Sequence, residues 1–106
     1  MTTSALVVLC TCPNHGVANL LANQIIAARL AACVNLVNPV QSVYLWQGKV
    51  EQSEEVQMII KTRTELFEPL RQFIRSHHPY QVPEIVGLPV VVADEEYLSW
   101  IGEVTQ

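Results

Sequence analysis

The chain has 106 residues, which is room for one domain spanning 1–106, and half of them are apolar while only 15% are charged. Average globular domains have about 25% charged residues, and short chains leave much surface exposed, so we expect copies of this chain to cover one another in part. The net charge of −4, with only six Lys and Arg, argues against nucleic-acid binding, which requires cations that neutralise phosphates.

The start of the chain and its apolar runs predict a soluble, cytoplasmic protein without a membrane segment. Residues 1–4 bring no positive charge ahead of the first apolar run, unlike a secretory signal. The longest apolar segment, 25–37, contains Arg29 and Asn35 and is too short to span a bilayer.

Cys10, Cys12 and Cys33 form an odd set of cysteines, which argues against a disulfide framework. Cys10 and Cys12 make a C-x-C pair, which is weaker evidence for a metal site than two C-x-x-C pairs would be. The alternative is that these residues are small apolar side chains that fill a core, and this alternative is stronger for Cys33 than for Cys10.

The first third of the chain predicts a strand and then a helix. The continuous apolar run over 5–10 is typical of a strand buried on both faces, and Pro13-Asn14 ends it. Over 17–32 apolar residues recur at helical spacing. Most of them are alanine, so we expect this helix to lie close against a sheet.

A long hairpin follows. Its outgoing strand covers 33–37, is interrupted at Asn38-Pro39, and resumes over 40–46. Gln47-Gly48 predicts the turn, and the return strand begins near Lys49. An arm longer than its own sheet leaves unpaired edges and needs a partner.

The last third predicts a helix, a strand and a short helix. Thr64 is a suitable N-cap, but Pro69 lies deeper than the ideal first helical position, so the helix begins later than Thr64 or is kinked. The last strand is expected over 85–92, with Pro89 at an edge or bulge, and Asp94 opens the terminal helix. The order βαββαβ plus a short helix predicts an α+β, ferredoxin-like split βαβ fold.

The segment 77–84 is the most informative part of the chain. It places two imidazoles, a phenol and a carboxylate within eight residues, and its two prolines forbid regular helix. A stiff loop that carries such side chains more often serves function than packing.

Taken together, these segments resemble the CutA divalent-cation tolerance proteins over nearly the whole chain. The matching motifs are VVLCT at 7–11 with Pro13, LAACVN at 30–35, SVYLWQGK at 42–49, EVQMIIKT at 55–62, HHPYQVPE at 77–84 and YLSW at 97–100. The resemblance implies a tight homotrimer in which long hairpins pair between subunits.

The same resemblance implies a role in tolerance to divalent metals, with copper bound by bacterial members. The metal ligands that it carries over are Cys10, His77 and His78. Cys12 stands where other members often have a small residue, so it is an extra thiol. Any protein partner remains unidentified.

The fold offers an independent reason why Cys10 should meet the histidines. In a ferredoxin-like sheet the first and last strands are antiparallel neighbours, so the end of the first lies beside the start of the last, near the histidine loop. Thiolate plus imidazole suits copper or zinc, or a similar divalent metal. Consecutive residues diverge in regular backbone, so His77 and His78 could join one ion only through a sharp bend or a neighbouring subunit.

Structural alternatives stay open at the sequence level. His78 could cap the preceding helix, and Glu84 could pair with Lys61 or a backbone amide. Tyr80 could be a core residue with a satisfied hydroxyl. Two further sets have ordinary interpretations: the aromatics Tyr44, Trp46 and Trp100 as interface or core, and the acidic cluster Glu51, Glu54 and Glu55 as a solvated face.

Three functions compete. The first is a trimeric copper- or divalent-cation-binding protein without catalysis. The second is a trimeric signalling or scaffold module like the PII regulators, for which we find no Gly-rich phosphate loop. The third is an enzyme with Cys10 as nucleophile, for which no orienting group or oxyanion motif is visible.

Overall fold

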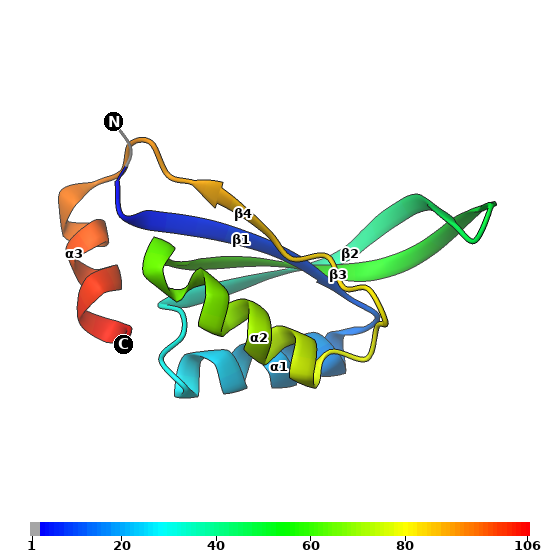
Figure 1. The fold of residues 1–106 in the computed structure, drawn as a ribbon, viewed down its shortest axis with the longest axis horizontal. Helices are drawn as coiled ribbons and strands as arrows, with labels where there is room; N and C mark the ends of the chain where they lie inside the picture. Colours follow the sequence, from blue (N-terminus) through cyan, green and yellow to red (C-terminus); the bar gives the residue numbers. More distant parts are fainter. Residues whose placement is uncertain (1–2) are drawn as a thin grey trace.

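The computed structural model describes residues 3–106 and shows a sheet covered on one face by helices (Figure 1). The four strands lie in the order β2-β3-β1-β4, and every neighbouring pair is antiparallel. Two helices, α1 (His15–Ala27) and α2 (Phe67–His77), lie against the same face of the sheet (Figure 1). The predicted α+β, ferredoxin-like order of elements is confirmed.

The first strand, β1 (Ala5–Cys12), lies inside the sheet between β3 and β4. Its alternate residues Leu6, Val8, Cys10 and Cys12 are all buried in the main core, because residues two apart in a strand share a face. Helix α1 then begins after Asn14, whose side-chain oxygen accepts from Val17 N at 2.9 Å and caps the helix.

Helix α1 is shorter than the expected span of 17–32. It ends at Ala27, and Arg29 adopts a positive φ of 60° two residues later. The apolar spacing over 28–32 therefore belongs to the turn that leads into β2, where Leu30 and Ala31 are buried. The buried apolar residues of this turn are spaced like those on the buried face of a helix, which is why the sequence predicted a longer helix.

The hairpin follows the prediction closely. Strand β2 (Cys33–Trp46) and strand β3 (Lys49–Arg63) are joined by Gln47 and Gly48, which both have positive φ. The register shifts between Val37 and Val40, at the cis Asn38–Pro39 peptide. Beyond this shift the two strands run out of the body of the molecule as a free arm (Figure 1).

The second half of the chain differs from the prediction at two places. Thr64 is no N-cap: it opens a short 3-10 turn, η1 (Thr64–Leu66), and its hydroxyl donates to Ser4 O. Pro69 is the third residue of α2, so the expectation that the helix begins later than Thr64 is confirmed. Strand β4 (Val86–Pro89) is shorter than 85–92 and ends at Pro89, which has no N–H to donate, although Val90 still exchanges backbone hydrogen bonds with Ala5 and Thr3.

The terminal helix α3 (Glu95–Val104) lies at the end of the sheet where β1 begins (Figure 1). As expected, Asp94 opens it, and its carboxylate accepts from Tyr97 N at 3.2 Å.

The arm formed by the outer parts of β2 and β3 is barely covered: Val43, Leu45 and Val50 are 60%, 71% and 73% exposed. The arm therefore offers apolar side chains and strand edges that the described residues leave uncovered.

Candidate functional site

The site begins with two thiols on one strand. Cys10 and Cys12 are both 0% exposed and lie on the helix-covered face of β1. His78, which is 8% exposed, follows directly after α2 and lies against them. One ligand atom from each of the three residues falls within 4.8 Å of the others. Two sulfurs and one imidazole nitrogen thus form a buried cluster.

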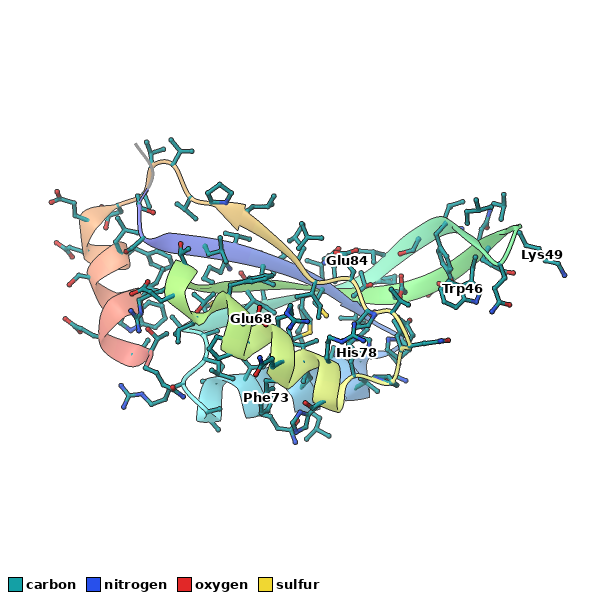
Figure 2. The ribbon with its side chains drawn as sticks, in the orientation of Figure 1. Trp46, Lys49, Glu68, Phe73, His78 and Glu84 are labelled. Carbon is teal, nitrogen blue, oxygen red and sulfur yellow. The ribbon has the colours of Figure 1, made fainter. Side chains whose placement is uncertain are left out.

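The topology explains why residues far apart in sequence meet here. Strand β4 is antiparallel to β1, with Leu9 opposite Val86. The segment that joins α2 to β4 therefore passes the end of β1 that carries Cys10 and Cys12. Figure 2 labels His78 at the start of this segment, beside the end of α2. The expected meeting of Cys10 with one histidine is observed.

His77 does not join this group. Its side chain is exposed, its Nδ1 lies 2.8 Å from Phe73 O, and its ring stacks on Phe73 with centroids 4.1 Å apart. The His77 imidazole thus contacts a carbonyl near the end of α2. His78 is the C-cap residue of this helix, as the sequence suggested, and its backbone N–H donates to Ile74 O at 2.8 Å. The two histidines diverge as expected, and metal ligation by His77 stays a prediction.

Hydrogen bonds fix the ring of His78. Tyr80 N donates to Nδ1 at 3.1 Å, and Nε2 lies 2.8 Å from Thr11 O. Since Nδ1 accepts, the ring proton sits on Nε2 and is donated to the Thr11 carbonyl. A metal bound through either nitrogen would replace one of these two bonds, so ligation requires a local rearrangement.

Met58 adds a third sulfur that sequence reasoning missed. Its Sδ lies 3.4 Å from Cys12 Sγ, and its side chain is 0% exposed. The signal that could have found it is the register, because Met58 pairs with Cys10 across β1 and β3. Thiol and thioether sulfurs are the soft ligands that suit copper and zinc.

The two thiols differ in acidity. The hydrogen bond between them lowers the pKa of Cys12 to about 6, with His78 adding to this effect and burial opposing it. The same hydrogen bond, followed by burial, raises the pKa of Cys10 far above its usual range. Burial alone would lower the pKa of His78, but its hydrogen bonds with Cys12 and Thr11 raise it. Cys12 is therefore the first thiolate of the pair.

The acidic residues near this site correct one expectation. Glu55 is 6% exposed and so does not belong to a solvated face, although Glu51 and Glu54 are exposed. The Glu55 carboxylate accepts from the Tyr80 hydroxyl at 2.6 Å, which satisfies that hydroxyl as predicted.

Glu84 and Lys61 form no ion pair within 3–106. Glu84 is exposed instead, and Lys61 Nζ lies 3.9 Å from Cys33 Sγ.

The chain is similar to known proteins over nearly its whole length. The family model described as CutA1 divalent ion tolerance protein matches residues 6–104. The chain belongs to this family. The divalent-cation tolerance protein CutA of Escherichia coli is 48% identical over 100 residues, covering 94% of this chain and 89% of that protein. The family description names ion tolerance and no reaction.

Solved structures agree with this assignment. CutA1 from Oryza sativa superposes with a TM-score of 0.95 at 41% identity, covering 99% of this chain and 96% of that one. The divalent cation tolerance protein from Thermus thermophilus gives 0.94 at 43% identity, covering 96% and 99%.

Relatives differ in length. Protein CutA of Mus musculus is 47% identical over 96 residues, and the chain spans only about half, 54%, of its length. Within 3–106 no helix combines the length and apolar composition needed to cross a bilayer.

Proposed function

We propose that this CutA-family protein binds copper, or a similar soft divalent metal, as a cytoplasmic homotrimer that serves metal tolerance. The observation that carries this proposal is the grouping of Cys10, Cys12 and His78, three buried residues whose ligand atoms lie within 4.8 Å of one another. The three free cysteines suit a reducing compartment.

The donor set supports copper or zinc over harder cations. Calcium and magnesium prefer oxygen ligands, whereas two thiols and an imidazole are soft donors. Three donors leave a coordination position open, which is typical of an exchangeable site rather than a closed structural one. Binding would release protons, because thiols ligate as thiolates.

The arm supports a trimer. Its apolar residues Val43, Leu45 and Val50 are exposed, and β2 and β4 are both edge strands of the sheet. Exposed apolar edge strands invite pairing with another chain. A neighbouring copy could also bring a second imidazole to the site, which would give His77 the ligand role that the resemblance implies.

Equilibrium dialysis against copper tests the proposal. Wild type should retain copper, Cys10→Ser and His78→Ala should each lose most of it, and Cys33→Ser should retain it as the matched control. His77→Ala decides whether the exposed imidazole takes part. Equal copper content in all variants would reject these ligands.

A further inference from the structure

The sulfur atoms of the buried cluster form a donor set of their own. Cys12 Sγ lies 3.4 Å from Met58 Sδ, and Cys10 Sγ lies within 4.8 Å of Cys12 Sγ. Cys10 and Met58 are also direct cross-strand partners in β1 and β3. Two thiols and one thioether, from two neighbouring strands, therefore gather at one point of the sheet.

The three sulfur-bearing side chains are closed to solvent. Cys10, Cys12 and Met58 are each 0% exposed and belong to the main core beneath the helices. Assembly with further copies of the chain could only add to this burial, so it does not depend on what covers the arm. An ion held by these sulfurs is therefore shielded from water in the single subunit and in a trimer alike.

The thioether is a more available donor than the imidazole. Both ring nitrogens of His78 are engaged: Nδ1 accepts from Tyr80 N at 3.1 Å, and Nε2 lies 2.8 Å from Thr11 O. The hydrogen bond to Met58 Sδ comes from the Cys12 thiol. Such a bond is weak, and it disappears in any case when the thiol ligates a metal as thiolate. Ligation by sulfur alone thus leaves the strong hydrogen bonds of the site intact.

We propose that Cys10, Cys12 and Met58 form a site for monovalent copper, Cu(I), without His78 as a ligand. Thiolate and thioether ligands select Cu(I), whereas imidazole also suits zinc, nickel and iron. The inference rests on the proposed copper binding and names the oxidation state and the donors that the buried cluster takes. Divalent copper, in contrast, draws on the imidazole and needs the rearrangement around His78.

Competition with the Cu(I) chelator bicinchoninate, under nitrogen with ascorbate, tests the thioether. Wild type should withdraw Cu(I) from the chelator. Loss of an outer-shell partner already weakens metal binding about 10- to 100-fold, so loss of a ligand in Met58→Leu should weaken Cu(I) by at least about tenfold. Ile60→Leu is the matched control, because it changes the shape of a buried side chain two residues along β3 without removing sulfur. Equal Cu(I) affinity in Met58→Leu and wild type overturns the proposal.

His78→Ala separates the sulfur ligands from the imidazole. This variant should keep the Cu(I) affinity of wild type, although it loses divalent copper in the dialysis described above. A loss of Cu(I) as large as that in Met58→Leu would make the imidazole a ligand and reject the sulfur-only site.

X-ray absorption at the copper K edge gives a test that needs no variant, and so does not depend on whether His78→Ala folds. The wild-type protein loaded with Cu(I) should show a first coordination shell of sulfur alone. A nitrogen or oxygen ligand in that shell overturns the proposal.

The two oxidation states distinguish a failure of this inference from a failure of the proposed function. Retention of divalent copper without withdrawal of Cu(I) from bicinchoninate rejects the sulfur site and leaves the proposed function standing. Withdrawal of Cu(I) without retention of divalent copper supports the sulfur site and restricts the protein to the monovalent ion. Binding of neither form rejects both.

Discussion

The sulfur cluster of Cys10 and Cys12 and the cavity lined by Glu55 and Glu84 lie on opposite faces of the same short stretch of β1. Cys10 and Cys12 face the helices and are fully buried, whereas Thr11 between them lines an open cavity. One face holds soft sulfur atoms that are closed to solvent, and the other holds the buried Glu55 carboxylate, the exposed Glu84 and the partly exposed rings of Tyr44 and Trp46. The alternation of a strand thus gives three consecutive residues two separate chemistries.

Tyr80 contacts both regions. Its backbone N–H holds the His78 ring, and its hydroxyl holds the Glu55 carboxylate. The two regions share this residue, but we expect them to act independently. Changes on one face should therefore leave the other intact.

The largest effect is expected from removing both thiols. Cys10→Ser with Cys12→Ser should lower copper affinity by about a hundredfold or more, because the soft ligands are replaced by hydroxyls. Competition with a copper chelator measures it. The stability that the Tyr80–Glu55 hydrogen bond contributes should not change, and a parallel loss there would show that the faces are coupled.

Met58 separates packing from ligation. Met58→Ala should lower the free energy of unfolding by about 2 to 5 kcal/mol, because it leaves a cavity in the core. Met58→Leu preserves volume and should cost less than about 1.5 kcal/mol. Urea denaturation measures both.

If the thioether helps to hold copper, Met58→Leu should bind copper more weakly than wild type even though the variant is almost as stable as wild type. Copper affinity equal to wild type would restrict Met58 to packing.

Tyr80→Phe tests the contact on the cavity side. It removes the hydroxyl that donates to Glu55 and leaves the backbone bond to His78 in place. Stability should fall by about 1.5 to 3 kcal/mol, as for hydrogen bonds to charged groups. Copper binding should be retained, and its loss would mean that the hydroxyl supports the sulfur cluster too.

The smallest effect concerns alkaline pH. Burial, and then the hydrogen bond to Glu55, raise the pKa of Tyr80 above its ordinary value near 10. Because the folded state holds this proton more tightly, the resulting stability is fully present below pH 10 and is lost as pH rises toward the folded pKa. The stability difference between wild type and Tyr80→Phe should therefore narrow from pH 8 to pH 11 in urea titrations. A constant difference would contradict the shift.

Sequence reasoning succeeded where local patterns decide structure. Alternation in β3, the turn at Gln47-Gly48 and the cap at Asp94 all depend on neighbouring residues, and the structure has them as expected. Pairing of the first and last strands follows from the fold class. That pairing was enough to place Cys10 near the histidine loop.

The rest depended on contacts that sequence spacing does not reveal. Which histidine turns inward is decided by two bonds at the His78 ring, from Tyr80 N and to Thr11 O. Met58 joins through cross-strand register, and the burial of Glu55 depends on the segment that brings Tyr80 over it. Apart from the local bond from Tyr80 N to His78, each of these is a tertiary contact between residues far apart in the chain.

The complete burial of Cys10 and Cys12 has a kinetic consequence. An ion in solution cannot touch either sulfur until the segment beginning at His78 swings away or the end of β1 loosens. Uptake should therefore become independent of metal concentration once that opening is rate-limiting. The lifetime of the loaded state would be set by how often the protein opens as well as by the strength of the bonds to the ion.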